Sequence, residues 1–255
     1  MPADRPRFIA IASGKGGVGK TWFAITIAHA LIRSSLRVLL IDADLGLANV
    51  DVQLGLTPRV DLGSIISGRT KVAHAVTRHD ATGLDVLAGQ SGSGALASLP
   101  EAGLEFLLSR LREETGNYDA ILLDLSAGID RTVRRLAAWS DLLLVVATDE
   151  PTSLTDSYAV IKLQTVDQPD GDVRIVINQA QSLAEGHQTY ATLRRACTAF
   201  LHREPPLAGV IRHDPKVRDA IRRQASLLHR HPNSSAAQDV EALARGYMTR
   251  WNGRD

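Results

Sequence analysis

The chain has 255 residues, of which 44% are apolar, and a formal net charge of +1, so a single large α/β domain over residues 1–255 can bury a sizeable core. The longest internal apolar run, Leu142–Ala147, is too short to cross a bilayer, and the first residues contain no signal-peptide core. The one cysteine, Cys197, excludes an internal disulfide and a Cys-x-x-Cys metal or cluster site. We therefore expect a cytoplasmic protein.

Short apolar runs rich in β-branched residues alternate along the chain with segments whose apolar residues recur at helical spacing. The runs predict strands at residues 8–12, 37–41, 84–88, 120–125, 141–148, 173–178 and 207–211. The segments between them predict helices at residues 22–32, 103–114, 130–139, 154–166 and 189–202. This alternation favours an α/β fold, a mostly parallel twisted sheet with helices on both faces. Ligands of such sheets bind beyond the carboxyl ends of the strands.

The first predicted strand is followed by Ser-Gly-Lys-Gly-Gly-Val-Gly-Lys-Thr, residues 13–21. Gly14, four further residues and then Gly19, Lys20 and Thr21 match the P-loop, in which main-chain N–H groups cradle phosphate oxygens and the lysine reaches the β- and γ-phosphates. The loop stands between a predicted strand and a predicted helix, as the motif requires. Thr21 is placed to offer its hydroxyl to Mg²⁺. The other lysine of the loop, Lys15, has no role in this pattern.

Two of the predicted strands end in acidic residues at the same edge of the sheet. Asp42 and Asp44 come after the strand at 37–41, and Asp124 ends the run Ile-Leu-Leu-Asp, with Gly128 just beyond it. A carboxylate at this place suits Mg²⁺ held through its waters, and a glycine allows a main-chain N–H to approach a γ-phosphate. These roles fit Asp124 and Gly128, and one of Asp42 and Asp44 could orient the attacking water.

The stretch from Lys15 to Thr21 resembles the deviant Walker A motif of the MinD/ParA ATPases. In that family an additional lysine near the start of the loop reaches across a dimer interface to the partner's ATP. The resemblance implies this role for Lys15, a catalytic and nucleotide-holding role for Lys20, and an ATPase that uses ATP and Mg²⁺. The residues expected to contact the nucleotide are Gly14, Lys15, Gly16, Gly17, Val18, Gly19, Lys20, Thr21, Trp22, Gly128 and Asn178.

Three further stretches, residues 42–51, 150–158 and 231–237, resemble the flagellar-number branch of the MinD-like ATPases, the FlhG/FleN-like proteins. The resemblance implies a switch that dimerises with ATP, hydrolyses it slowly to ADP and phosphate, and so returns to monomers. It also implies regulation of flagellar number or placement through flagellar assembly or transcription-regulator proteins.

The same resemblance assigns roles to single residues. Asp44 would position the catalytic water, Asp42 and Asp124 would support Mg²⁺ beside Thr21, and Asn178 would contact adenine. Apart from any resemblance, the 150–158 stretch is suited to begin a helix. Its helix-start features are Pro151 near the first turn and a capping pair of Ser153 and Asp156.

The sequence departs from the family in three places. Many members of the branch carry an N-terminal extension that activates the GTPase FlhF, whereas seven residues precede the first predicted strand here, which puts such activation in doubt. The usual Asp-Thr-Gly-Ala-Gly is Asp-Leu-Ser-Ala-Gly at residues 124–128, and Arg212 replaces a proline that is common near the last strand. These changes bear on rate or switching rather than on nucleotide binding.

The C-terminal region leaves a membrane contact open. Val240, Leu243, Ala244, Tyr247, Met248 and Trp251 lie at helical spacing, as in an amphipathic anchor of the MinD type. Arginines at 245, 250 and 254 supply the only positive charge there, and Glu241 opposes them. We favour a helix packed on the domain's own core over a peripheral anchor at the inner face of the membrane.

Residues 187–232 are locally basic, with nine Lys/Arg against three Asp/Glu and five of the eight histidines. Solvated helix faces explain this bias most simply, and an anionic partner is the alternative. A ParA-like partition ATPase would place this segment on DNA, and a MinD-like division-site ATPase is a related possibility. A metal-cluster carrier needs paired cysteines, which are absent from the sequence, and the second lysine disfavours a small-molecule kinase.

Overall fold

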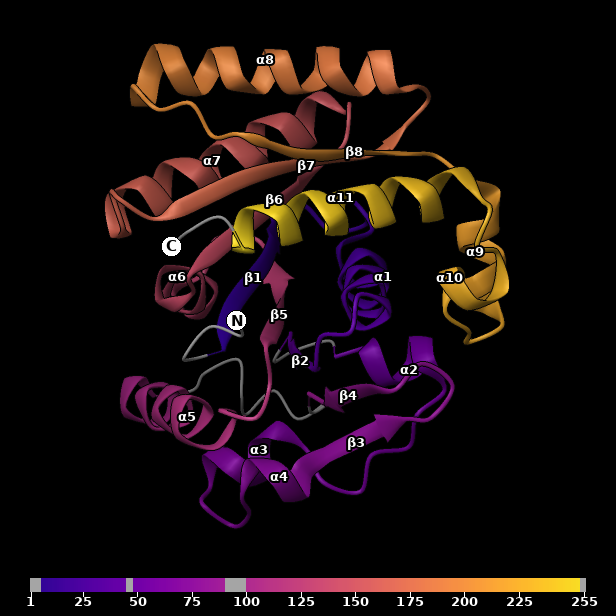
Figure 1. Ribbon diagram of the computed structural model, residues 1–255. Coiled ribbons are helices and arrows are strands. Elements are labelled where there is room, and N and C mark those ends of the chain that lie inside the picture. The colour runs from indigo at the N-terminus through magenta and orange to yellow at the C-terminus, as the bar shows by residue number, and fades with distance from the viewer. Residues whose placement is uncertain (1–5, 45–47, 90–99, 253–255) are drawn as a thin grey trace.

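The computed structural model describes residues 6–44, 48–89 and 100–252, with side chains up to residue 248. Its strands form an eight-stranded sheet in the order β3-β4-β2-β5-β1-β6-β7-β8 (Figure 1). Neighbouring strands are parallel except β3, which pairs antiparallel with β4. The strands are β1 Arg7–Ser13, β2 Val38–Ala43, β3 Val76–His79, β4 Leu84–Leu87, β5 Ala120–Ala127, β6 Leu142–Ala147, β7 Asp172–Ala180 and β8 Leu207–Arg212.

Helices cover both faces of this sheet, which confirms the α/β fold expected from the sequence (Figure 1). One face carries α1, α2, α9, α10 and α11, and the other carries α3, α4, α5, α6, α7 and α8. Their bounds are α1 Lys20–Arg33, α2 Val50–Leu54, α3 Leu62–Ile66, α4 Val72–Ala75, α5 Glu101–Glu114, α6 Arg131–Trp139, α7 Pro151–Asp167, α8 Leu183–Leu201, α9 Pro215–Arg222, α10 Leu227–Arg230 and α11 Ser235–Asn252.

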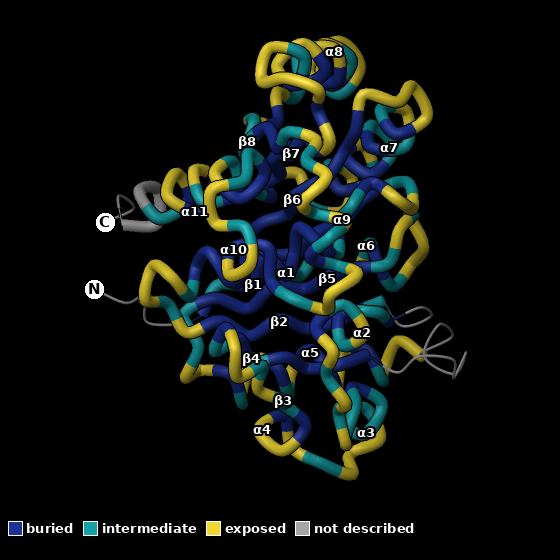
Figure 2. Tube along the Cα trace, turned by 90° about the vertical axis from the view of Figure 1, so that its right-hand side faces the viewer, coloured by how far each residue is buried: buried dark blue, intermediate teal, exposed yellow. Residues whose placement is uncertain are grey.

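The central strands are apolar along their length because both of their faces are covered. In Figure 2 they form a continuous buried layer between helices whose outer turns are exposed. All six residues of β6 are buried. The strand β1 lies between β5 and β6, with Ile9 opposite Leu122 on one side and Leu142 on the other. The loop that follows β1 is therefore held at the middle of the carboxyl edge.

The C-terminal helix α11 packs on the core, as favoured from the sequence. Val240, Leu243, Ala244 and Tyr247 are buried in the same cluster as residues of α1, and α11 also lies against β8. The apolar face of this helix is thus covered by the protein through residue 248, and the side chain of Trp251 lies outside the described residues. Within the described residues, no helix has the length and apolar character needed to span a bilayer.

Each strand and helix expected from the sequence is present, with shifts at the ends and several additions. The additions are β3 and the short helices α2, α3, α4, α9 and α10. These were missed because each is at most eight residues long, and β3 is a half-buried edge strand with the polar sequence Val-Thr-Arg-His. Helix α8 begins six residues earlier than expected, where the Ser182 hydroxyl caps it by accepting from the Glu185 N–H at 3.1 Å.

Helix α7 begins at Pro151, so residues 150–158 do start a helix. The expected capping pair of Ser153 and Asp156 is wrong, since Glu150 occupies the cap position without a side-chain capping bond. The Ser153 hydroxyl instead accepts the Thr148 N–H at 3.0 Å and ties the end of β6 to the first turn of α7. Ser153 and Thr148 are both buried, and a buried N–H requires a hydrogen-bond acceptor. The Ser153 hydroxyl therefore serves the end of the strand and does not cap the helix.

Candidate functional site

The loop between β1 and α1 has the backbone shape of a phosphate cradle. Gly17 and Gly19 have φ values of 83° and 85°, in the left-handed region that favours glycine. A Cβ at Gly19 would also stand 2.5 Å from the Asn178 amide nitrogen, so the site excludes larger residues twice over. Gly14 approaches α7 equally closely, because a Cβ there would collide with the main chain of Asp156. The loop thus leads directly into the N-terminus of α1, where unpaired N–H groups favour an anion.

Lys20, the first residue of α1, lies inside the protein and forms an ion pair with the last buried acid of β5. Its Nζ is 2.8 Å from Asp124 Oδ1, and the two side chains are 8% and 1% exposed. Burial raises the pKa of Asp124, while the ammonium of Lys20 and the hydroxyl of Thr21 act in the opposite direction. The pair therefore holds the Lys20 ammonium beside the buried Asp124 carboxylate, next to the cradle.

Asp42 lies directly opposite Asp124 on the neighbouring strand β2. Its carboxylate accepts the main-chain N–H groups of Asp44, Asn49 and Val50 at 3.2, 2.8 and 2.9 Å. Burial and the nearby charge of Asp124 nevertheless raise the pKa of Asp42 to about 7, because three hydrogen bonds do not offset both effects. Two carboxylates that resist ionisation together are suited to a cation between or near them.

The donor set around this pair fits Mg²⁺. The Thr21 hydroxyl and the carboxylates of Asp42 and Asp124 are all oxygen donors, as Mg²⁺ prefers, and the hydroxyl lies close enough to Asp124 to affect its pKa. In the described part of the chain, no three His, Cys, Asp or Glu side chains gather as a complete protein cage for a metal ion. This is the usual situation for Mg²⁺ at a phosphate site, where waters and phosphates supply most ligands.

The other lysine of the loop, Lys15, lies at the surface. Its Nζ forms an ion pair with Glu150 and a hydrogen bond of 3.1 Å to the Thr152 hydroxyl, both at the start of α7. The side chains of Lys15 and Glu150 are 38% and 58% exposed, so this pair is open to solvent. The two lysines of one loop thus have opposite environments, one buried beside Asp124 and one exposed beside Glu150.

Asp44 and Gly128 complete the edge. The Asp44 carboxylate accepts a hydrogen bond from the Ser126 hydroxyl at 3.1 Å. Gly128 has a φ of 109°, and its N–H donates to the carbonyl of Ser13 at 2.9 Å. In this form the N–H therefore bonds to the cradle itself, and an approach to a γ-phosphate would require it to leave Ser13.

Beside the cradle lies a cavity of about 230 Å³ between the ends of β7 and β8 and helix α9. Trp22 and Asn178 both line it, together with the cradle residues Gly17 and Gly19. The Asn178 amide donates to the carbonyl of Val18 at 2.7 Å, so Asn178 braces the cradle as well as facing this cavity. Gln179, which sequence reasoning missed, supports Gly17 in the same way with a bond of 3.3 Å. Its only sequence signal is its place after Asn178.

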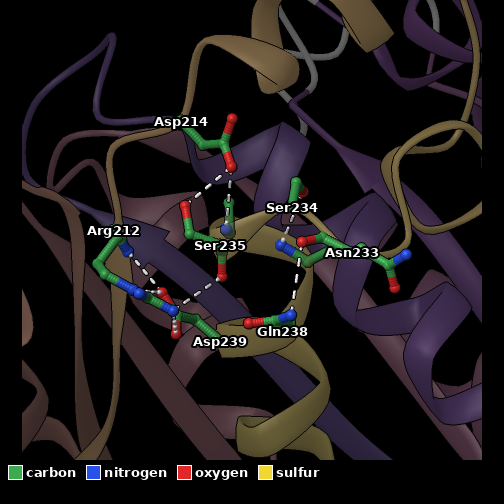
Figure 3. Close-up of polar contacts among 9 residues, drawn as sticks. Arg212, Asp214, Asn233, Ser234, Ser235, Gln238 and Asp239 are labelled. Atoms are coloured by element: carbon green, nitrogen blue, oxygen red, sulfur yellow. Dashed lines mark hydrogen bonds and ion pairs between the residues drawn. The ribbon is translucent and has the colours of Figure 1, made fainter.

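The far wall of this cavity is tied to helix α11 (Figure 3). Asp214 caps α9 by accepting the Lys216 N–H at 2.9 Å, and its other oxygen accepts the Ser235 hydroxyl at 2.8 Å. Arg212 forms a two-point ion pair with Asp239, with bonds of 2.9 and 2.8 Å. The stretch 231–237 thus joins the cavity wall to the last helix. Arg212 lines the cavity, and its guanidinium is paired with Asp239.

A phosphate cradle after the central strand of a mostly parallel sheet, with buried acids at the neighbouring strand ends, defines a P-loop NTPase. The sequence profile of the CobQ/CobB/MinD/ParA nucleotide-binding domain matches residues 9–227. The chain belongs to this family, whose members include ATPases, and it is an ATPase of that kind.

Among curated proteins, the chain is 38% identical over 238 residues to the antiactivator FleN of Pseudomonas aeruginosa, covering 93% of this chain and 84% of FleN. It is 30% identical over 241 residues to the flagellum site-determining protein YlxH of Helicobacter pylori, covering 93% and 80%. A solved structure of the septum site-determining protein MinD from Pyrococcus horikoshii, complexed with Mg-ADP, matches with a TM-score of 0.80, 24% identity and coverage of 97% and 98%.

Proposed function

We propose that this protein is an ATP-dependent dimerising switch that regulates flagellar number or placement. The observation that carries the proposal is the contrast between the two loop lysines, one buried for its own nucleotide and one exposed at the protein surface. The likeness to FleN and to YlxH supports the flagellar assignment. The expected partners are flagellar assembly or transcription-regulator proteins and a second copy of this chain.

The buried pair gives Lys20 its role in binding. A nucleoside triphosphate in the cradle carries more negative charge than the Asp124 carboxylate alone. Lys20 would therefore turn from Asp124 to the β- and γ-phosphates. Asp124 is then released to act with Asp42 and Thr21 as the oxygen donors that hold Mg²⁺. Mg²⁺, when bound, neutralises phosphate charge. Trp22 and Asn178 line the cavity beside the cradle, which supports their assignment as nucleotide contacts.

Lys15 supplies the differential affinity that a ligand-driven switch requires. A solvent-exposed ion pair is worth little, whereas an ammonium placed on phosphate oxygens at a closed interface gains more because water is excluded there. Transfer of Lys15 from Glu150 to the partner's ATP therefore favours the dimer only while the triphosphate is present. Hydrolysis, with water oriented by Asp44, removes that contact and restores monomers.

Sedimentation of purified protein tests the switch. We expect monomers without nucleotide and with ADP, and dimers with Mg-ATP. Lys15→Ala should abolish the dimer while ATP binding persists, whereas Lys162→Ala, which removes an exposed lysine of α7, should behave as wild type. The same oligomer in all three nucleotide conditions would contradict the proposal.

An affinity pull-down from the native host tests the flagellar assignment. Asp44→Ala is expected to trap the ATP-bound dimer, and the double variant with Lys15→Ala serves as its control. Flagellar or transcription-regulator proteins captured only by the trapped form would support the assignment. Capture of lipid in their place would indicate a MinD-like role in division-site positioning, and capture of DNA would indicate a ParA-like role in partition.

One observation favours an anionic partner as a second possibility. Lys216, Arg218, Arg222 and Arg223 are exposed on or directly after α9. Within the described residues, Arg223 alone of the four forms an ion pair, with Asp219 at 3.9 Å. DNA binding that requires ATP and weakens steeply with salt would favour a ParA-like role. Co-sedimentation with anionic liposomes would favour peripheral membrane contact, although α11 offers no uncovered apolar face through residue 248.

A further inference from the structure

The register between β2 and β5 brings Ser126 next to Asp44. Asp42 lies opposite Asp124, and Ala43, the last residue of β2, lies opposite Leu125. Just past the end of β2, Asp44 meets Ser126 through a hydrogen bond. Side chains two residues apart on a strand share a face of the sheet. Asp42 and Asp124 therefore share the sheet face of Leu40 and Leu122, which packs against α1. Asp44 lies close enough to Asp124 for its charge to act on that carboxyl.

Hydrogen bonds to Asp42 and from Ser126 hold Asp44 at this place. Its main-chain N–H donates to Asp42 Oδ1 at 3.2 Å, which ties the backbone to the buried acid. Its side chain accepts from the Ser126 hydroxyl at 3.1 Å, which limits rotation of the carboxylate. Of these two bonds, the second acts on the carboxylate that would touch water. Both Asp44 and Ser126 are half-buried, so the bond is partly shielded from competition by solvent.

A carboxylate orients water well only if its own direction is set. Asp44 has two oxygens with about four lone-pair positions, so a water can be accepted beside the Ser126 hydroxyl. A third group that orients a base is the same arrangement that activates nucleophiles in hydrolytic enzymes.

We propose that Ser126 is a positioning residue for ATP hydrolysis, whose hydroxyl sets the direction of the Asp44 carboxylate toward the attacking water. This inference rests on the proposed function, in which Asp44 orients that water. Ser126 does not touch the nucleotide in this arrangement, so its effect falls on the chemical step rather than on ATP binding.

Single-turnover and steady-state hydrolysis by purified protein test the inference. Removal of one hydrogen bond to a charged group lowers kcat about tenfold in Ser126→Ala, with KM for ATP unchanged within about twofold. Ser126→Thr keeps a hydroxyl at the same carbon and restores most of the lost kcat. Ser109→Ala removes an exposed hydroxyl from α5 and retains wild-type kinetics. Equal thermal midpoints of all variants separate positioning from loss of folding.

A double-mutant cycle with Asp44→Asn distinguishes a positioning role of Ser126 from a purely structural one. If Ser126 acts through Asp44, Ser126→Ala has no further effect on kcat in the Asp44→Asn background. A wild-type or raised kcat in Ser126→Ala, or a raised KM alone, overturns the inference while loss of hydrolysis in Asp44→Asn leaves the proposed function standing. Wild-type hydrolysis by Asp44→Asn removes the proposed role of Asp44 and the inference with it.

Discussion

Lys15 and Glu150 form an ion pair that joins the phosphate cradle to the first turn of helix α7. The two residues are 135 positions apart in the chain. The pair occupies the lysine that the proposed dimer would need at the partner's nucleotide. The monomer thus holds Lys15 in a contact that must be given up on dimerisation.

Weakening that contact is expected to favour the dimer. Glu150→Gln keeps the size of the side chain and removes its charge. The free-energy cost of moving Lys15 from residue 150 to the partner's ATP is therefore lower. Because both partners are exposed, the effect is modest, and the protein concentration for half-maximal dimerisation in Mg-ATP should fall about two- to fivefold. Glu113→Gln, an exposed change on α5, is the control. Weaker dimerisation of Glu150→Gln would mean that Glu150 itself contributes to the dimer.

The buried pair of Lys20 and Asp124 makes a different prediction. Lys20→Ala should abolish nucleotide binding and lower the free energy of unfolding by about 3 kcal/mol at pH 8, because Asp124 is left buried without its cation. The loss should shrink at pH 6, since burial raises the pKa of Asp124 and a protonated carboxyl needs no cation. Urea unfolding at both pH values measures this. A loss that does not depend on pH would show that Asp124 stays ionised without Lys20.

His29 gives the protein a dependence on acid that is separate from the site. It lies buried in α1 with its Nδ1 2.5 Å from the Ser226 hydroxyl, and burial lowers its pKa from 6.5 to about 4. Between pH 6.5 and 4, His29 is protonated in the unfolded chain but neutral in the folded protein. The stability that the neutral, buried His29 contributes is therefore present above pH 6.5 and is lost as the pH falls toward 4. His29→Gln should therefore lose less stability than wild type between pH 6.5 and 4.5. Parallel pH profiles would exclude the effect.

Asp42 acts in the opposite direction. Its pKa of about 7 means that the folded protein, without nucleotide or Mg²⁺, binds a proton between pH 3.8 and 7 that the unfolded chain has released. Stability from this group therefore falls as the pH rises through that window. Asp42→Asn removes the opposition to His29, so the free energy of unfolding should rise more steeply with pH than in wild type. Measurements in EDTA from pH 4.5 to 7.5 decide this, and an unchanged slope would contradict the raised pKa.

Gly246 offers a stabilising substitution in helix α11. A Cβ at this position meets no atom within 4 Å, and the backbone is helical, so Gly246→Ala should raise the free energy of unfolding by about 0.5–1 kcal/mol. Gly186 in helix α8 is the matched control, because a Cβ there collides with the Val210 side chain. Gly186→Ala should destabilise the protein. The same sign for both variants would show that helix propensity alone decides the outcome.

Much of the site follows from local sequence. The glycines of the cradle need left-handed backbone or close approach, and a buried apolar strand before them allows few other structures. The same holds for Asp42 and Asp124, which follow buried apolar runs toward the carboxyl ends of β2 and β5. Parallel strands bring their carboxyl ends to one edge, so these acids were expected beside the cradle without knowledge of the partners along the sheet.

Contacts between segments that are distant in the chain could not be predicted from the sequence. The bond of Ser126 to Asp44 depends on the register of β2 against β5, and the pairing of Lys15 with Glu150 depends on β6 lying beside β1. The tie of Asp214 to Ser235 likewise needs α9 and α11 to meet (Figure 3). Periodicity and motif spacing report what a segment does with its neighbours in the chain, whereas strand order, register and helix packing arise from burial of the whole core. The fold class and the phosphate cradle therefore follow from residues that are neighbours in the chain. The side chains that hold the candidate catalytic groups in place are brought together by the packing of distant segments.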